Sequence, residues 1–555
     1  MARSFRFHLT WEGAALIVIA ALLFIFPVIR LVFLSLSAED GGWTLAHYRT
    51  LFTDSRAGEA VWNTIYISLS ASIISAVCGV TTAFLVGYTN IRYKKLIEVL
   101  VYLPFVIPAY VITLSWTGLT VQGGALTLLL TKLGLPPLDL FTVGGIIAML
   151  GICHMSVVHV TVVHMLRKVP VEAGWAARAS GCGMWKALWK VDLPMVMPAV
   201  AGGTVLAFLA DVDNFAVPAF LGISSNIPVL STYIYEKVIS FGPDSFAYGA
   251  VLSVVLAIIA VTGTVLSALL YKKQNASESV REDHTVRVAF SPKVRRVVEL
   301  LAAGLLILFS VVPFLYMAVS ALLKTFVFSL DPDDMTLDNY AFVFTNDGVR
   351  EAAGNSLFMA GTATVICLVA GTLIAYALVR RGSRAAAFLE QCASMTYSVP
   401  GIVLALALIF YWSQPLPGVT TGLYGSYTIL ILGYVTRYMI LQIKNSATAI
   451  MAVGEASEEA ALVSGSSPFR MWVKILVPQL AAPALSGAFF MFLSALTELT
   501  MSSVMSSADT KTIGLAIFNL QQGGDYSLAA ALSAVILFAM AAVFAIHLLL
   551  KRFMK

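Results

Sequence analysis

Long apolar runs separated by short polar segments dominate the chain, and Ala14–Leu36 and Ala529–Leu550 are two clear examples. A helix needs about 20 residues to cross the hydrocarbon of a bilayer. Backbone groups there must be hydrogen-bonded within the segment, which favours helices over the shorter, alternating strands of a barrel. The pattern predicts twelve membrane-spanning helices, at 13–36, 61–88, 97–119, 142–165, 195–222, 247–271, 298–323, 353–379, 386–412, 425–444, 479–505 and 526–550. We therefore expect an all-α transmembrane protein.

Composition and charge agree with this interpretation. Apolar residues make up 59% of the 555 residues and charged residues only 12%, too few to cover the surface of a soluble protein of this size. With both termini inside, the inner loops carry most of the basic residues, as the positive-inside rule requires. Examples are Arg92, Lys94, Lys95, Arg167, Lys168, Arg380, Arg381 and Arg384. We therefore expect a multi-pass protein of the lipid bilayer with both termini cytoplasmic.

The chain also repeats itself. Asn63-Thr64 recurs as Asn355-Ser356 after 292 residues, and Gly181 recurs as Gly465 after 284 residues. We predict a first permease repeat at 1–270, a cytoplasmic linker at 271–297 and a second repeat at 298–555, each repeat with six spans. An even number of spans gives both repeats the same orientation. Such parallel repeats pack about an approximate twofold axis along the membrane normal, with a pathway between them.

One inner loop is shared by both repeats and carries the most specific pattern. In the second repeat, Glu458-Glu459-Ala460-Ala461 is followed by Gly465 and then by Pro478. The first repeat has Gly174-Trp175-Ala176-Ala177 before Gly181 and Pro194. The pattern predicts a short helix, a break at glycine, a second amphipathic helix and a proline that opens the next span. Fixed to two spans, such a helix could pass a push from a soluble partner into the membrane.

These loops resemble the signature of type I permeases of binding-protein-dependent ABC importers, in which proline follows glycine after thirteen residues. Thr497-Glu498-Leu499-Thr500 and the segment 512–518 make the chain most similar to the fused, twelve-span permeases of ferric iron importers. Importers of thiamine, phosphonate, polyamine or sugar phosphate remain alternatives. The resemblance implies the bacterial inner membrane as location. It also implies an external (periplasmic or extracellular) solute-binding protein as partner.

The resemblance further implies that each loop docks on one of two copies of a cytoplasmic ATPase subunit. The coupling residues it implies are Glu172, Ala176, Ala177, Gly181, Pro194, Glu458, Glu459, Ala460, Ala461, Gly465 and Pro478. The first loop departs from the signature, because Gly174 and Trp175 stand where the second has glutamates. Glu172 lies two residues early and is the candidate substitute.

The chain is not expected to be an enzyme. It contains no Gly-Lys dipeptide and hence no P-loop, so ATP and magnesium would be used by the partner ATPase. No nucleophile–base pair and no metal-ligand set appears, and we expect no bound cofactor, no resident metal and no nucleic-acid partner. A secondary transporter driven by an ion gradient is the alternative from another class, but it has no need of paired docking helices.

Polar side chains within the spans are the candidates for the pathway. They are Asp211, Asp213 and Asn214 in the fifth span and Thr497 and Glu498 in the eleventh. They could favour a cation such as Fe³⁺ in transit, and hydrogen bonding between helices is the alternative. At 100° per residue, Asp211 and Asn214 share a face while Asp213 points elsewhere.

Three histidines and one arginine within the spans have no assigned role. His154, His159 and His164 are five residues apart, so each is rotated by about 140° from the last and the three cannot bind one ion from one helix. We expect them to pack or to form hydrogen bonds. Arg437 needs an acidic partner that the sequence does not name.

Overall fold

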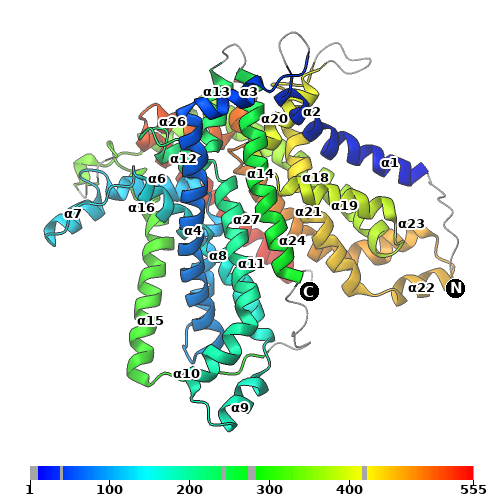
Figure 1. The fold of residues 1–555 in the computed structure, drawn as a ribbon, viewed down its shortest axis with the longest axis horizontal. Coiled ribbons are helices and arrows are strands. Elements are labelled where there is room, and N and C mark those ends of the chain that lie inside the picture. The colour runs from blue at the N-terminus through cyan, green and yellow to red at the C-terminus, as the bar shows by residue number, and fades with distance from the viewer. Residues whose placement is uncertain are drawn as a thin grey trace.

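Helices form nearly all the regular structure of the computed structural model (Figure 1), which describes residues 11–37, 42–240, 245–272, 283–326, 328–329, 331–414 and 422–553. Within these ranges the only strand-like pairings are three isolated bridges, Ser37–Trp43, Thr89–Val288 and Leu323–Met335. The two termini and residues 273–282 of the predicted linker lie outside the described residues. The predicted all-α fold is confirmed.

The elements of the first repeat run in this order: α1 (Trp11–Ala20), η1 (Ala21–Ile25), α2 (Phe26–Ser35), α3 (Ala46–Thr53), α4 (Ser55–Tyr88), α5 (Lys94–Val106), α6 (Ala109–Thr120), α7 (Ala125–Lys132), α8 (Val143–Lys168), α9 (Val171–Ala179), α10 (Met184–Ala187), η2 (Leu188–Asp192), α11 (Leu193–Asp213), α12 (Ala216–Leu221), α13 (Leu230–Ile239) and α14 (Ser245–Lys272). Helices α4, α8, α11 and α14 lie side by side (Figure 1).

The second part repeats the order: α15 (Pro292–Leu306), η4 (Ile307–Val311), α16 (Val312–Ser320), η5 (Pro332–Asp334), α17 (Asp338–Thr345), α18 (Asp347–Val379), α19 (Arg384–Tyr397), α20 (Gly401–Trp412), α21 (Tyr427–Val453), α22 (Ala456–Val463), α23 (Pro468–Met471), η6 (Trp472–Leu476), α24 (Val477–Leu496), α25 (Ser502–Met505), η7 (Ala508–Thr510), α26 (Ile513–Gln522) and α27 (Tyr526–Phe553). Helix α15 begins before residue 298, where the sequence placed the boundary.

Nine helical stretches in the described ranges are long and apolar enough to cross a membrane, and two further pairs of helices pass the same test together. The pairs are α5 with α6–α7, bent by 99°, and α19 with α20, bent by 116°. The predicted spans at 97–119 and 386–412 are therefore each two helices at an angle and not one continuous helix. Pro108 and Pro400 cause both breaks, because proline disfavours a helical conformation in the residue before it. The tenth predicted span, at 425–444, lies within the 27-residue helix α21.

Two other predicted spans, 195–222 and 479–505, are also interrupted. Helix α11 ends at Asp213 and α24 ends at Leu496, and each is followed by a short separate helix, α12 or α25. The predicted shared helical face of Asp211 and Asn214 is therefore wrong, because Asn214 has an extended backbone at the end of α11.

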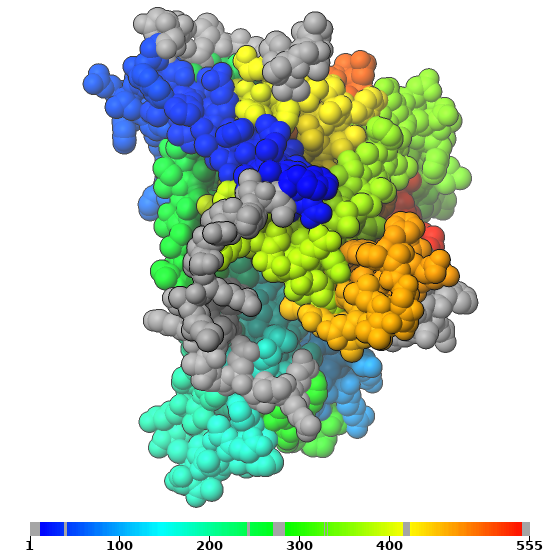
Figure 2. Space-filling view, turned by 90° about the vertical axis from the view of Figure 1, so that its right-hand side faces the viewer, coloured from blue at the N-terminus to red at the C-terminus, as the bar shows by residue number. Residues whose placement is uncertain are grey.

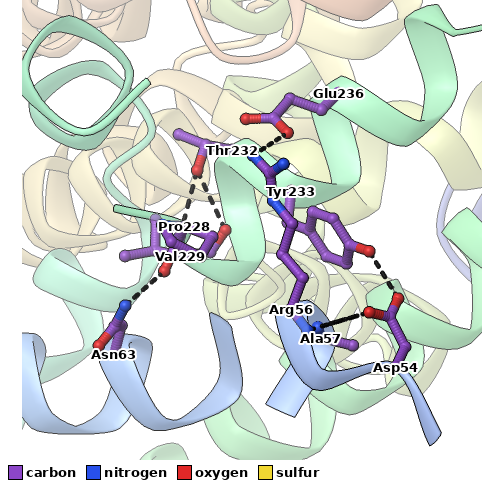
Figure 3. A network of polar contacts seen from close by, with 9 residues as sticks. All are labelled: Asp54, Arg56, Ala57, Asn63, Pro228, Val229, Thr232, Tyr233 and Glu236. Atoms are coloured by element: carbon purple, nitrogen blue, oxygen red, sulfur yellow. Dashed lines mark hydrogen bonds and ion pairs between the residues drawn. The ribbon is translucent and has the colours of Figure 1, made fainter. Parts of the chain in front are cut away.

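The repeated Asn-Thr and Asn-Ser pairs have the same structural role in both repeats. Asn63 Nδ2 donates to the Pro228 carbonyl (Figure 3), and Thr64 Oγ1 accepts a hydrogen bond of 2.8 Å from the amide of Leu230 at the start of α13. In the second repeat, Asn355 Nδ2 donates to the Asp509 and Lys511 carbonyls. Ser356 Oγ accepts at 2.8 Å from the amide of Ile513 at the start of α26. Each pair holds the corresponding short helix, and we call this side of the molecule the α13/α26 end.

The carboxylate of Asp54 makes a second connection at this end. It accepts hydrogen bonds from the Arg56 and Ala57 amides at the start of α4 and from the Tyr233 hydroxyl at 2.6 Å (Figure 3). The Tyr248 hydroxyl donates to the same carboxylate at 2.9 Å. Burial alone would raise the pKa of Asp54, but these four hydrogen bonds lower it below its ordinary value of 3.8. Asp54 thus caps α4 and joins it to α13 and α14.

The first helix of each repeat packs against the other repeat. Helices α1 and α2 contact α19 and α20, while η4 and α16 contact α5 and α6. Each of these first helices contains a π-turn, η1 or η4, just before Pro27 or Pro313. A π-turn suits this place because proline lacks the amide that would continue the α-helical pattern. This exchange ties the two repeats together.

Apolar packing also joins the repeats at the α13/α26 end. The ring of Phe518 in α26 lies 5.6 Å from that of Phe220 in α12 and 6.1 Å from that of Phe215. At the opposite end of the long helices, α9–α10 and α22–α23 form two separate protrusions (Figure 2). We call this the α9/α22 end. The repeats therefore pack together at the α13/α26 end, and their two loops protrude separately at the other.

Candidate functional site

The two loops singled out in the sequence have the same backbone structure. Gly181 and Gly465 follow α9 and α22 with positive φ values of 86° and 78°, the left-handed conformation that glycine adopts most readily. The Cys182 amide donates to the Ala177 carbonyl, and the Ser466 amide donates to that of Ala461, at 3.1 and 3.0 Å. This is the Schellman ending of a helix. The predicted helix with a break at glycine is confirmed in both loops.

The sequence pattern predicted that a proline opens the next span. In the structure the helix begins before each proline and continues through it. Helix α10, the π-turn η2 and α11 form one continuous helical stretch, Met184–Asp213, and the second repeat has the matching stretch Pro468–Leu496. Pro194 and Pro478 each lie just after the π-turn, in the first turn of α11 and α24. The wide π-turn tolerates a proline at this place, because proline has no amide to donate the next helical hydrogen bond. The amphipathic helix and the span are therefore one mechanical unit.

Both short helices expose the same face. In α9 the exposed residues at helical spacing are Glu172, Trp175, Ala176 and Ala179, and in α22 they are Ala456, Glu459, Ala460 and Val463. Each set follows the spacing i, i+3, i+4, i+7, which is one side of a helix. Val463 is 90% exposed and Trp175 is 55% exposed, and beyond the glycines Phe469 and Trp185 are 79% and 55% exposed. Trp185 and Phe469 correspond in the repeat, so both loops expose a large aromatic side chain at the same position beyond the glycine.

Glu458 points inward instead. Its carboxylate accepts hydrogen bonds from Arg380 Nε at 2.6 Å and from the Tyr376 hydroxyl at 3.0 Å, both near the end of α18. Arg380 also donates to the Ile450 and Gly454 carbonyls at the end of α21. Glu458 therefore fixes α22 to two long helices, while Glu459 faces outward. The sequence pattern identified Glu458 but not its partner Arg380. In the first repeat, the residue that corresponds to Arg380 is Tyr88.

The first loop has no glutamate in this place. Gly174 corresponds to Glu458, and it is buried. Glu172, the candidate substitute, is exposed and corresponds to Ala456 rather than to Glu458. Glu172 therefore does not take the place of the buried glutamate.

A polar cluster joins the repeats between their two ends. Asp213 at the end of α11 forms an ion pair with Arg437 of α21 and accepts a hydrogen bond of 2.6 Å from the Gly401 amide. Arg437 also donates to the Val399 carbonyl at 3.1 Å, so Asp213 and Arg437 together bond to the residues on both sides of Pro400, at the break between α19 and α20. We call the contact between Asp213 and Arg437 the cross-repeat ion pair. It supplies the acidic partner that Arg437 needs.

Asn214, Thr497 and Glu498, also pathway candidates, form hydrogen bonds only within their own repeat among the described contacts. Asn214 Oδ1 accepts from the Val217 amide at 3.0 Å, and Glu498 accepts from the Met501 and Ser502 amides at 2.7 and 3.0 Å. These two residues correspond in the repeat, and each caps the short helix that follows the interrupted span. Thr497 Oγ1 donates to the Leu493 carbonyl.

The histidines of α8 turn to different partners. His154 Nδ1 lies 2.5 Å from Asp211 Oδ1, and His159 Nδ1 lies 2.9 Å from Thr82 Oγ1. These contacts agree with the prediction that the histidines serve hydrogen bonding and do not converge. Asp211 is thus held within the first repeat, while Asp213 reaches the second.

Two like sets of apolar helices, joined by an ion pair and each carrying the same exposed loop, define a membrane permease with an internal repeat. The family model of the "binding-protein-dependent transport system inner membrane component" matches residues 79–276 and 367–555, which together make up more than half of the chain. The chain belongs to this family. It is a permease component of an ABC importer of the bacterial inner membrane, and ATP hydrolysis belongs to a separate subunit.

Curated relatives match the whole chain or part of it. A "probable ABC transporter permease protein y4fN" of Sinorhizobium fredii is 24% identical, covering 100% of this chain and 98% of that protein. The "ferric transport system permease protein FbpB" of Actinobacillus pleuropneumoniae is 23% identical over 95% of this chain and 77% of its own. The "maltodextrin transport system permease protein MalC" of Streptococcus pneumoniae is 22% identical, over 42% of this chain and 57% of its own.

Proposed function

We propose that the chain forms the complete alternating-access pathway of its importer, with α9 and α22 as the two coupling helices for a cytoplasmic ATPase dimer. The observation that carries the proposal is that the two helices expose the same four helical positions, with Ala176 and Ala460 at the centre. Exposing Val463 and Phe469 to water costs free energy unless a partner covers them. Apolar residues surrounded by polar ones are typical of a docking surface.

The way these helices are attached suggests how movement would be transmitted. Each one is followed by a glycine turn and then by a helix that continues without a break into α11 or α24. When ATP draws the two ATPase subunits together, the helices α9 and α22 approach and carry α11 and α24 with them. The repeats then close at the α9/α22 end and open at the α13/α26 end, where a solute-binding protein delivers its ligand.

This mechanism requires the coupling loops and both termini to be cytoplasmic, as the charge distribution predicts. A test is the binding of the purified cognate ATPase subunit to the full chain in nanodiscs. Ala176→Arg and Ala460→Arg each place a long charged side chain on the exposed face without disturbing the core, and we expect each to weaken binding. Ala508→Arg, an exposed alanine at the α13/α26 end, is the matched control. Unchanged binding in both loop variants would overturn the docking proposal.

We further propose ferric iron as the cargo. The support is the extent of similarity, because the ferric permease relative aligns with 95% of this chain and the maltodextrin relative with 42%. The acidic pathway candidates give less support than the sequence suggested, because Asp211, Asp213 and Glu498 each already have hydrogen-bond partners. Titration of the cognate binding protein with Fe³⁺, and with maltodextrin as the alternative, tests the assignment. Binding of the sugar and not of the metal would refute it.

A further inference from the structure

The first coupling loop lacks the glutamate that anchors the second one, yet its helix α9 is held at the corresponding place. In the second repeat the anchor is an arginine–carboxylate pair, Arg380 with Glu458. The corresponding residues of the first repeat are Tyr88 and Gly174, which can form no ion pair. The structure shows a different pair at this place, made by residues that form no ion pair at the corresponding place of the second repeat.

The carboxylate comes from Asp192, at the end of the π-turn η2. A Cβ placed on Gly174 would lie 3.7 Å from Asp192 Oδ2, so this carboxylate lies beside the point where the Glu458 side chain begins in the second repeat. Asp192 is only 4% exposed, and its counterpart in the second repeat is Leu476. An acidic group this buried requires a partner of opposite charge.

The arginine comes from the segment between the repeats. Arg287 forms an ion pair with Asp192 and donates to the Val169 carbonyl, just before α9. Its guanidinium also lies 4.3 Å from the centre of the Tyr88 ring, the side chain that replaces Arg380. Arg380 has the same combination of contacts, a carboxylate and a carbonyl at the end of the preceding long helix. Arg287 thus reproduces from outside the repeat what Arg380 does within it.

The same segment also caps the coupling helix. The N-cap residue of α9 is Pro170, whose side chain makes no hydrogen bond. Asp283 Oδ2 accepts from the Val171 amide at 3.2 Å instead, and the Asp283 amide donates to the Arg167 carbonyl at 2.6 Å. Burial would raise the pKa of Asp283, but hydrogen bonds from Thr285 and Val171 and the charge of Arg287 lower it. The carboxylate is therefore charged at neutral pH, as a helix N-terminus favours.

Backbone contacts fix the segment in register. The Arg287 and Val288 amides both donate to the Tyr88 carbonyl, at 2.9 and 3.0 Å. Asn90 exchanges two hydrogen bonds with the backbone of Phe290, at 3.1 and 3.0 Å. These contacts leave Arg287 little freedom, so its side chain is aimed at Asp192 by the fold and not by chance.

We propose that residues 283–290 of the segment between the repeats, through Asp283 and Arg287, position the first coupling helix in place of its missing glutamate. Arg287 is a positioning residue, because it touches the base of the loop and not the ATPase. The inference rests on the proposed coupling function. It means that the fusion of two permease repeats into one chain supplies part of the coupling apparatus, in addition to fixing the stoichiometry of the repeats.

The test measures docking at each loop separately in the full complex of the chain with its purified cognate ATPase subunit. A photo-crosslinking residue at Ser180 reports on the first loop and one at Ser464, the corresponding exposed position, reports on the second. Arg287→Ala is expected to lower crosslinking at Ser180 by roughly tenfold and to leave Ser464 unchanged, in the range of typical coupling effects. Arg380→Ala is expected to do the reverse. Arg296→Ala, at an exposed arginine of α15, is the matched control.

Three more variants keep the test independent of any folding defect. Asp192→Asn should reproduce the Ser180-selective loss, and the double variant with Arg287→Ala should lose no more than either single one. Arg287→Lys keeps the charge but cannot contact the Asp192 carboxylate and the Val169 carbonyl with two separate nitrogens, so it should retain part of the crosslinking at Ser180. Equal loss at both loops, or no loss in Arg287→Ala while Arg380→Ala lowers Ser464, overturns the inference. Absence of crosslinking at both loops in the unmodified complex would instead refute the proposed function.

Discussion

The cross-repeat ion pair offers the sharpest test of how the two repeats move. Arg437 is nearly buried, with a side chain 10% exposed, while the Asp213 side chain is 34% exposed. Replacing Arg437 by methionine keeps the volume of the side chain and removes the guanidinium. Asp213→Asn keeps an oxygen that accepts from the Gly401 amide and removes the charge. Both variants therefore break the ion pair with little change in packing.

The free-energy cost of breaking the cross-repeat ion pair follows from the contacts that each group loses. Breaking a buried ion pair by removing one partner costs about 3–5 kcal/mol, but the partly exposed Asp213 carboxylate can be rehydrated, which lowers this figure. The Val399 carbonyl loses a donor, which costs roughly 1 kcal/mol. A net effect of about 2–3 kcal/mol is expected for Arg437→Met, or roughly a 30- to 150-fold shift in a conformational equilibrium.

The ion pair joins α11 to the break between α19 and α20, so it favours the arrangement seen here, with the repeats packed together at the α13/α26 end. Without it, the ATPase complex should leave this arrangement more easily. We expect a higher basal rate of ATP hydrolysis in the absence of binding protein, and spin-label distances between the repeats that shift before nucleotide is added. The control is Arg350→Met, which breaks an exposed ion pair with Asp347 that contributes little.

Because Arg437 and Asp213 act as a pair, the double variant should resemble the stronger single variant and not their sum. If both single variants keep the basal rate and the distance distribution of the unmodified complex, the ion pair does not hold the repeats together. Simple additivity would show that the two residues act separately.

Two further predictions concern the opposite ends of the molecule. Gly465→Ala imposes about 1–2 kcal/mol of backbone strain at a φ of 78° without a steric clash, and should weaken binding of the ATPase subunit about tenfold. Gly361→Ala, in the middle of α18 with open space around it, should leave binding unchanged. Asp54→Asn should lower the melting temperature at neutral pH by removing charge-assisted hydrogen bonds worth about 1–3 kcal/mol. Because folding lowers the pKa of Asp54, the charged carboxylate stabilises the fold above pH 3.8, and this effect is lost as the pH falls through the folded pKa. The melting temperatures of the unmodified chain and of Asp54→Asn should therefore converge below pH 3.8.

The sequence predicts the helices of this molecule well because membrane insertion leaves a strong signal, a run of apolar residues about as long as the bilayer is thick. It does not predict where helices break within such a run. Pro108 and Pro400 matched across the repeat, but their effect on chain direction depends on the neighbouring helices. Likewise, Asn214 and Glu498 were placed at corresponding positions, and only the structure shows that both cap short helices.

The coupling loops show a second limit of the same kind. A glycine followed after thirteen residues by a proline is a local pattern, and it predicted both turns. The anchor of each loop is not local, because Arg380 is 78 residues from Glu458 and Arg287 is 95 residues from Asp192. A comparison of the repeats does give one usable signal, the coincidence that Gly174 and Tyr88 both lack the charge of their counterparts. Two linked losses of this kind indicate that a third element has taken over the contact.

This substitution has a consequence for the working of the two halves. Helix α22 is anchored by residues of its own repeat, so it moves with α18 and α21. Helix α9 is anchored through Arg287 and Asp283 to a segment that leads directly into α15 of the second repeat. Helix α15 packs in turn on α5 of the first repeat, and Glu299 of α15 accepts a hydrogen bond of 2.7 Å from the Arg92 amide just before α5. A displacement of α9 is therefore transmitted to the second repeat as well as to α11. A displacement of α22 has a different route to the first repeat, because Arg381, beside the anchor Arg380, forms an ion pair of 2.9 Å with Glu12 of α1. The two coupling helices share a backbone and an exposed face, but they are connected differently, and equivalent changes at the two loops should not have equal effects on ATP hydrolysis.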